Sequence, residues 1–505
     1  MKIIRGTIIF MAALALGLQA RAQTAVQQYI GQLKTTDELK EAVWGIRAVK
    51  VGGQVVADYG SATRMMPASN VKVLTTGLAL NELGADYRFR TRLAYAGEIV
   101  DGVLKGDLYI VGGGDPTIGA RDSVATALQT TFSQWEKLVR AAGIKRVEGR
   151  VVGDGRWLDC EPQNPSWQLE DAATGDGTVM TGLSFGGGLQ AFNVTAGARA
   201  GEPAKVEAVF PEVPWMTFRH TCTTGAAGTE ESLYYDCTDL APVASMTGSV
   251  PLGTKSKRIT CTNSFGALTC AFYFYRYLEN QGIVVEEGPA DIDAGGCLRD
   301  FVSPDDGMPA AVPQESLHFI GEYFSPKLKD IVRQTNTQSN NYYAEAILRV
   351  LARERRGSAS SASCRAVSLE AFGRLGVTGA DRVQIYDGSG LARKNYITPD
   401  FFVRFLTAMR KSPAADDFRR SLPRAGSGTL ASRLQSAPES VRNRVFMKSG
   451  SMNGVRCFSG YIMPSDGGGE EDIIVFSILT NNTVTAASRI NFIMDKLIGL
   501  MAQEN

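Results

Sequence analysis

The stretch Met66-Pro67-Ala68-Ser69-Asn70-Val71-Lys72 places a lysine three residues after a serine. Apolar residues then recur at helical spacing until Gly84 ends the pattern, at Val71, Leu74 and Leu78. This spacing predicts a helix that begins near Ser69. Residues three apart share one face of a helix, so we expect the Ser69 hydroxyl and the Lys72 amine to point into the same cleft.

This pair has the chemistry of a nucleophile and its base. Serine is a weak nucleophile until a neighbouring group takes its proton. Lys72 can do so only if its pKa falls well below ~10, which burial or a second cation would cause. Backbone N–H groups at a helix start would also favour a developing oxyanion. By itself the S-x-x-K pattern occurs by chance in many proteins, and a surface capping pair is the other interpretation.

Histidine is scarce, because the chain of 505 residues contains only His220 and His318. A zinc site built on several histidines is nearly excluded, and a Ser-His-Asp triad would need one of these two. We interpret both as structural. A catalytic base in this protein is therefore expected not to be histidine.

Two distant segments supply possible partners for the pair. Ser339 and Asn341 offer a hydroxyl and an amide two residues apart, just before a predicted helix over residues 344–351. The stretch Met447-Lys448-Ser449-Gly450-Ser451 precedes a predicted strand, and a glycine there would let a substrate backbone approach closely. Each segment alone is compatible with an ordinary turn or a solvated lysine. In the order S-x-x-K, S-x-N and K-S-G, the three match the signature of β-lactamases and penicillin-binding proteins.

The chain resembles peptidase family S13, the D-alanyl-D-alanine carboxypeptidases/endopeptidases, which are low-molecular-mass penicillin-binding proteins. About 270 residues separate Ser69 from Ser339, and the resemblance assigns this gap to inserted domains. The second motif reads Ser-Asn-Asn where β-lactamases commonly have Ser-Asp-Asn, and the third reads Lys-Ser-Gly rather than Lys-Thr-Gly. Neither change removes a functional group. Further stretches that resemble the family are 106–110, 112–116, 386–391, 421–423 and 428–430.

The resemblance implies acyl transfer on peptidoglycan stem peptides, with β-lactam antibiotics as covalent inhibitors and no metal or organic cofactor. Ser69 would attack the carbonyl of the penultimate D-alanine while Lys72 takes its proton. In the same way, the resemblance implies that Ser339 relays a proton and that Asn341 binds the acyl amide. Lys448 and Ser449, with Gly450 beside them, would bind the terminal carboxylate. The backbone N–H groups of Ser69 and Ser451 would form the oxyanion hole.

Both ends of the chain read as antiparallel strands flanked by helices. The predicted strands are 44–51, 54–59, 457–463 and 473–480, and the predicted helices start near residues 26, 71 and 485. The middle is richer in glycine, threonine and short strand-like runs, and Ser358–Ser363 reads as a surface loop. We predict an α/β (α+β) protein with a β-lactamase/transpeptidase-like domain over 23–95 and 311–505. A β-rich region over 96–310, with two subdomains, would be inserted into it.

Residues 1–22 read as a signal peptide, with a basic start, an apolar run and small residues before Gln23. We therefore expect export, to a periplasm by analogy with the family. Disulfides are permitted there, and the nearest pairs in the chain, Cys222 with Cys237 and Cys261 with Cys270, are the expected bridges. Lys plus Arg (53) nearly equals Asp plus Glu (52), which gives no electrostatic case for nucleic acid.

Three alternatives stay open. A β-lactamase or a serine esterase could be built on the same core, and a cell-wall scaffold without activity is a third possibility. Asp154, in the inserted region, either touches the stem peptide or is an exposed loop carboxylate.

Overall fold

The structure is a computed structural model, which describes residues 23–161, 163–177, 179–238, 242–292 and 312–504. The predicted signal peptide and Cys297 lie outside the described residues.

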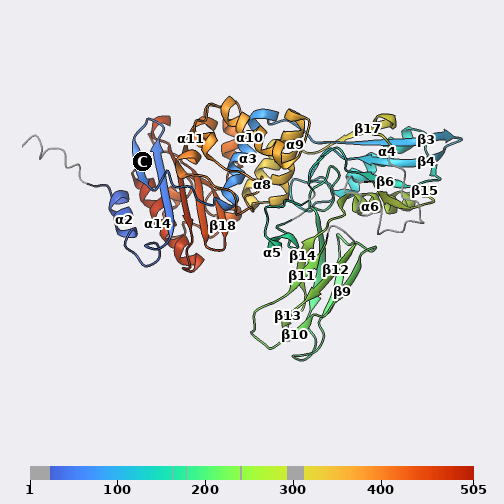
Figure 1. Cartoon of the computed structure of the whole chain (residues 1–505), viewed down its shortest axis with the longest axis horizontal. Helices are drawn as coiled ribbons and strands as arrows, with labels where there is room; N and C mark the ends of the chain where they lie inside the picture. Colours follow the sequence, from blue (N-terminus) through green and yellow to red (C-terminus); the bar gives the residue numbers. More distant parts are fainter. Residues whose placement is uncertain (1–22, 162, 178, 239–241, 293–311, 505) are drawn as a thin grey trace, which may run out of the picture.

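Strands from both ends of the chain form one antiparallel sheet. Its order places strands from the C-terminal end next to the N-terminal hairpin, as Figure 1 shows by colour. The central strand β20 is buried along its whole length, because it is apolar on both faces. In order across the sheet, the strands are β18 (Val445–Met452), β19 (Val455–Ile462), β20 (Ile474–Asn481), β1 (Val43–Lys50) and β2 (Val55–Tyr59).

Helices cover both faces of this sheet. On one face, α2 (Ala25–Leu33) and α14 (Ala487–Gln503) share an apolar cluster with alternate residues of the strands. The opposite face packs on a second cluster, whose helices include α3 (Val71–Leu83), α8 (Leu328–Gln338), α9 (Asn341–Arg356), α10 (Ser361–Arg374) and α11 (Pro399–Met409). The predicted fold class is confirmed.

The predicted loop over Ser358–Ser363 is wrong in its second half. The side chain of Ser360 accepts a hydrogen bond from the backbone N–H of Ser363, and α10 begins at Ser361. The serines are therefore part of a helix start rather than a loop.

A seven-stranded sheet lies beyond α9 (Figure 1). It contains β17, which pairs with β3 although more than 200 residues lie between them. Helix α4 (Leu128–Ala141) and helix α6 (Gly266–Asn280) share its apolar core. The strands are β3 (Arg90–Val100), β4 (Val103–Val111), β5 (Arg146–Val147), β6 (Val151–Asp154), β15 (Val284–Val285), β16 (Pro289–Asp291) and β17 (His318–Phe324).

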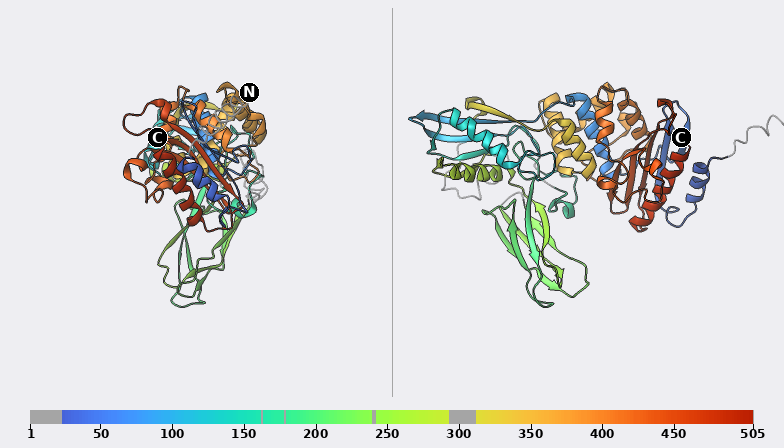
Figure 2. Two further views of the ribbon diagram at one scale, coloured as in Figure 1. Left: turned by 90° about the vertical axis from the view of Figure 1, so that its left-hand side faces the viewer. Right: turned by 180° about the vertical axis from the view of Figure 1, so that it is seen from behind.

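A small β region projects from the rest of the molecule (Figures 1 and 2). It has an apolar cluster of its own, separate from that of the seven-stranded sheet. The division of the inserted region into two subdomains stays a prediction, and its predicted start after residue 95 falls inside β3. Its strands are β7 (Leu189–Thr195), β8 (Lys205–Val209), β9 (Thr217–His220), β10 (Thr223–Gly225), β11 (Tyr234–Cys237), β12 (Val243–Thr247), β13 (Ser249–Pro251) and β14 (Lys257–Thr262).

Both expected disulfides are wrong, because Cys222, Cys261 and Cys270 carry free thiols. Cys261 packs in the core of the small β region, whereas Cys270 lies on α6 in the core of the seven-stranded sheet. Cys261 and Cys270 are therefore close in the sequence but lie in two different cores. Among the described residues, no helix is both long enough and apolar enough to cross a membrane.

Candidate active site

Ser69 lies in a single turn of 3-10 helix, Ala68–Asn70, directly before α3. Ala68 has φ +46°, which a residue with a side chain adopts only where its surroundings hold it. Asn70 is buried and hydrogen bonded to Ser459 Oγ of β19 at 2.9 Å. The turn that carries Ser69 is thus fixed against the five-stranded sheet.

Lys72 is buried at the start of α3, with its amine enclosed by three acceptors. Its Nζ lies 3.0 Å from Ser69 Oγ, 2.6 Å from Asn341 Oδ1 and 2.6 Å from the carbonyl oxygen of Ser389. Burial lowers the pKa of Lys72 to about 8, against the opposing effect of nearby carboxylates. A substantial fraction of the amine is therefore neutral near physiological pH, as a base requires.

The second motif bridges two helices. Ser339 ends α8 in the left-handed conformation, with φ +57°. Asn340 begins α9, because its side chain accepts a hydrogen bond from the backbone N–H of Tyr343 at 2.9 Å. Either asparagine or aspartate can cap a helix in this way, so the Ser-Asn-Asn sequence keeps the local structure. Asn341 then projects from the first turn of α9 toward Lys72.

The third motif lies on β18. Lys448 is fully buried, and its Nζ donates to Ser339 Oγ at 2.9 Å and to the carbonyl oxygen of Ser449 at 2.7 Å. Burial, reinforced by the charge of Lys72, holds the pKa of Lys448 well below its ordinary value. The structure therefore brings all five predicted catalytic side chains together, in two hydrogen-bonded groups formed by Ser69, Lys72 and Asn341 and by Lys448 and Ser339.

Gly450 was expected to face a substrate backbone, but it faces the turn that carries Ser69. A Cβ at this position would lie 2.6 Å from the carbonyl oxygen of Pro67 and 3.2 Å from the backbone N of Ser69. The missing side chain thus lets β18 approach the Ser69 turn, rather than leaving room for a substrate. Ser451, the next residue, is exposed, and its place beside this contact is compatible with the predicted oxyanion hole.

Ser449 faces outward from β18. Its Oγ lies 3.2 Å from Oγ1 of Thr429, a residue of the 3-10 turn Gly428–Leu430. Thr429 therefore adds a hydroxyl beside the predicted carboxylate-binding position. The sequence contained a signal for it, since residues 428–430 resemble the family, but no role was assigned.

Two buried carboxylates lie behind Lys72: Glu345, which sequence reasoning missed, and Asp387, which belongs to a stretch that resembles the family. Oε1 of Glu345 accepts from the backbone N–H groups of Gly388 and Ser389, at 3.0 and 2.8 Å. Asp387 accepts from the backbone N–H groups of Gly390 and Ala392, at 2.9 and 2.6 Å. Together they fold the 387–392 loop so that a main-chain carbonyl meets the Lys72 amine.

The inserted region also reaches the site. Asp176 accepts two hydrogen bonds from Asn341 Nδ2, one through its backbone oxygen at 3.1 Å and one through Oδ1 at 3.3 Å. Trp167 donates from Nε1 to Oδ2 of Asp387 at 2.9 Å. Nothing in the sequence distinguished Asp176 from other acidic residues.

Three other candidates lie elsewhere. Asp154 is neither an exposed carboxylate nor part of this group, because it is buried at the end of β6 and pairs with Arg156 at 2.8 Å. His318 stacks on Tyr95 in the seven-stranded sheet, and His220 stacks on Phe218 in the small β region.

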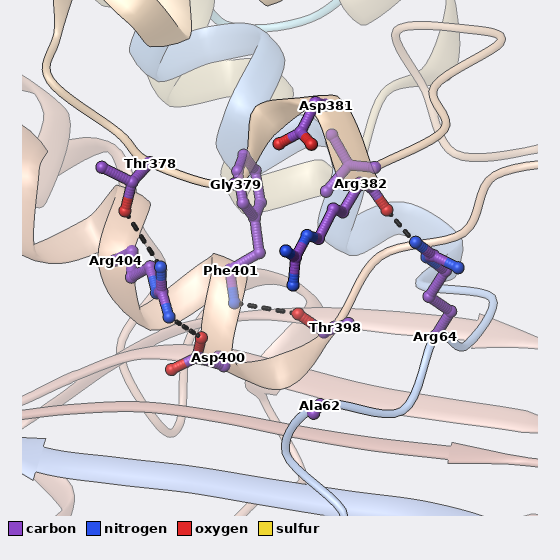
Figure 3. A pocket seen from close by; sticks show the side chains of 11 residues that line it. Ala62, Arg64, Thr378, Gly379, Asp381, Arg382, Thr398, Asp400, Phe401 and Arg404 are labelled. Atoms are coloured by element: carbon purple, nitrogen blue, oxygen red, sulfur yellow. Dashed lines mark hydrogen bonds and ion pairs between the residues drawn. The ribbon is translucent and has the colours of Figure 1, made fainter.

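A separate pocket of about 490 Å³ opens beside the start of α11 (Figure 3). Its lining is charged, but Arg404 is already paired with Asp400 at 2.7 Å, and Arg64 donates to the carbonyl of Arg382 at 2.8 Å. It contains none of the predicted site residues.

Comparison with known proteins identifies the family of the chain. The D-Ala-D-Ala carboxypeptidase 3 (S13) family matches residues 12–294 and 303–503. The chain is 31% identical over 478 residues to a D-alanyl-D-alanine carboxypeptidase of Actinomadura sp. (strain R39), covering 91% of this chain and 81% of that protein. It is also 22% identical to a D-alanyl-D-alanine carboxypeptidase of Haemophilus influenzae, over 82% of this chain and 81% of the relative.

The fold has a counterpart among solved structures. Penicillin binding protein 4 from Haemophilus influenzae superposes with a TM-score of 0.76, at 20% identity, covering 95% of this chain and 98% of that one. At this identity the likeness concerns the fold. The family match over almost the whole length and the Actinomadura relative lead to one conclusion: the chain belongs to the D-Ala-D-Ala carboxypeptidase 3 (S13) family of serine peptidases.

Proposed function

We propose that this protein cleaves the D-Ala-D-Ala bond of peptidoglycan stem peptides through an acyl-enzyme on Ser69. The observation that carries the proposal is the buried Lys72 amine, 3.0 Å from Ser69 Oγ. The assigned activity of the Actinomadura relative, a D-alanyl-D-alanine carboxypeptidase, supports the same substrate class.

In the first step, neutral Lys72 takes the proton of Ser69 while Oγ bonds to the carbonyl carbon of the penultimate D-alanine. The backbone N–H groups of Ser69 and Ser451 stabilise the negative oxygen, and loss of one such donor typically costs about 10²–10³ in rate. The Nδ2 of Asn341 donates to the carbonyl of the acyl amide.

Collapse of the tetrahedral intermediate breaks the C–N bond. The proton that Lys72 took from Ser69 passes to the leaving amine, with the Ser339 hydroxyl as the relay. Lys448, with the hydroxyls of Ser449 and Thr429, forms the polar side of the site that receives the substrate's terminal carboxylate. The distance of 2.9 Å between Lys448 Nζ and Ser339 Oγ supports a common position for carboxylate and leaving group.

Water then attacks the ester, and Ser69 regains its proton. A free D-alanine leaving group makes the enzyme a carboxypeptidase, and a cross-linked diamino acid makes it an endopeptidase. A β-lactam would acylate Ser69 in the same way, and penicillin binding protein 4 of Haemophilus influenzae has been solved in complex with a novel β-lactam. We propose an exported, periplasmic enzyme, because its substrate lies outside the cytoplasm.

Labelled penicillin tests the proposal directly. We expect the label on the peptide that contains Ser69, identified by mass, and its absence from the Ser69→Ala variant. A folded wild-type protein that takes up no label would contradict the mechanism and favour a silent scaffold. Rapid release of hydrolysed penicillin, without lasting label, would instead identify a β-lactamase.

Substrate preference needs a second assay. Purified protein is incubated with a D-Ala-D-Ala pentapeptide and, separately, with a cross-linked peptide dimer. Release of D-alanine from the first marks the carboxypeptidase, and separation of the second into monomers marks the endopeptidase. Hydrolysis of simple esters alone would favour the serine esterase alternative.

A further inference from the structure

A loop of the inserted region, Thr174–Gly177, lies against the catalytic group. Nδ2 of Asn341 donates to the backbone oxygen and to Oδ1 of Asp176, while its Oδ1 accepts from Lys72 at 2.6 Å. A side-chain amide can turn over and exchange its oxygen for its nitrogen. The two acceptors on Asp176 favour the orientation in which the oxygen faces Lys72.

This loop is attached to the small β region. Oγ1 of Thr262, the last residue of β14, lies 2.7 Å from the carbonyl oxygen of Thr174. Thr174 also forms an isolated β-bridge with Cys261. Gly177 closes the turn, because a Cβ there would lie 2.3 Å from the carbonyl oxygen of Asp171. A continuous series of contacts therefore runs from β14 through the loop to Asn341 and Lys72.

Asp176 also carries charge into the site. The charged groups around Lys72 are Asp387 and Glu345 behind it, Asp176 at the loop and Lys448 on β18. The two buried carboxylates belong to the catalytic region, whereas Asp176 is exposed and comes from the insertion. The negative charge of Asp176 raises the pKa of Lys72, against the effect of burial.

We propose that Asp176 is a positioning residue for acyl transfer, supplied by the inserted region, which orients Asn341 and through it Lys72. This inference rests on the proposed function. Asn341 Nδ2 is also the donor that the mechanism assigns to the substrate's acyl carbonyl. An incoming substrate therefore replaces the longer contact, to the Asp176 carboxylate, while the backbone contact keeps the amide oriented.

The test is the pH profile of acylation by labelled penicillin. Asp176→Asn keeps an oxygen for Asn341 but removes the charge. The acylation rate rises with pH along a rising limb, as Lys72 loses its proton, and then reaches a plateau. We therefore expect the rising limb to move to lower pH by about half a unit, with the plateau rate within about twofold of wild type. Glu170→Gln, an exposed carboxylate on the same segment, is the matched control and should leave the limb in place. Thr262→Val should lower the plateau about tenfold without moving the limb, because it releases the loop and keeps the charge.

The outcomes separate the two proposals. If the wild type takes up no penicillin, the proposed function fails. If the wild type is labelled but Asp176→Asn leaves the limb unmoved, Glu170→Gln moves it equally, or Thr262→Val keeps the wild-type plateau, this inference alone is overturned. Thermal unfolding of each variant identifies a protein that has failed to fold. If Asp176→Asn fails to fold, Asp176→Glu takes its place, and this variant must retain the wild-type limb because it keeps the charge.

Discussion

Lys72 must be neutral to accept a proton from Ser69, and burial lowers the pKa of Lys72 to about 8. Below that pH most of the amine is protonated, so the neutral fraction rises about tenfold per pH unit and levels off above pH 8. We expect the second-order rate of acylation by labelled penicillin to follow this curve between pH 6 and 9. A rate that is flat over this range would contradict Lys72 as the base.

Side chains of the three motifs could be predicted from sequence because each motif keeps its own residue types at fixed spacing. Their remaining partners could not. The oxygen of Ser389 that meets Lys72 belongs to the main chain, which leaves no mark in the sequence. Asp176 is one of 52 acidic residues, and only folding brings it to Asn341.

At the scale of elements, the approach of β18 to the Ser69 turn depends on Gly450. Gly450→Ala would place a Cβ 2.6 Å from the carbonyl oxygen of Pro67, so the strand or the turn must shift. We expect acylation by penicillin to fall about 10²-fold, because a displacement of about 1 Å costs that much.

Gly499→Ala on α14 is the matched control. A Cβ there meets nothing within 4 Å, and alanine favours a helix interior over glycine by about 0.5–1 kcal/mol. This variant should be slightly more stable in urea and fully active. Equal activity of the two alanine variants would show that the close approach at Gly450 is not needed.

Elements near both ends of the chain could be predicted because α3 repeats apolar residues at helical spacing and β20 is a mostly apolar run of strand length. Most strands of the small β region could not be delimited. Two of them, β10 and β13, are only three residues long, too short for an alternating pattern to emerge. The residues of β13 and β10 pair only after the region has folded.

At the scale of the whole molecule, the inserted and catalytic regions are joined by partly buried polar contacts. Trp167 donates to Asp387 at 2.9 Å, and Asn164 donates to the carbonyl of Tyr386 at 2.8 Å. Trp167→Phe leaves the Asp387 carboxylate short of one donor, so we expect a loss of about 1–3 kcal/mol in the free energy of unfolding. Urea titration measures this change.

Trp215→Phe provides the comparison, because the Nε1 of Trp215 is buried without a partner. Removing that N–H breaks no hydrogen bond, so the variant should lose only ring packing and therefore less stability than Trp167→Phe. If both variants lose the same stability, the contact with Asp387 contributes nothing beyond ring packing.

The pairing of β17 with β3 is also a property of the whole molecule. His318 faces Tyr95 across more than 200 residues of chain, and no local pattern predicts such a partner. The sequence therefore indicated that a region is inserted, but it could not indicate that strands from both sides of the insertion share one sheet.

The contacts of Trp167 and Asn164 have a consequence for chimeric enzymes. The 386–387 segment belongs to the catalytic region, but two of its hydrogen-bond donors come from the insertion. A graft that exchanges the insertion between relatives therefore also exchanges part of the support for the loop beneath Lys72. Such a chimera keeps its catalytic geometry only when the insertion, with its two donor side chains, and the 386–387 segment that accepts from them are transferred together.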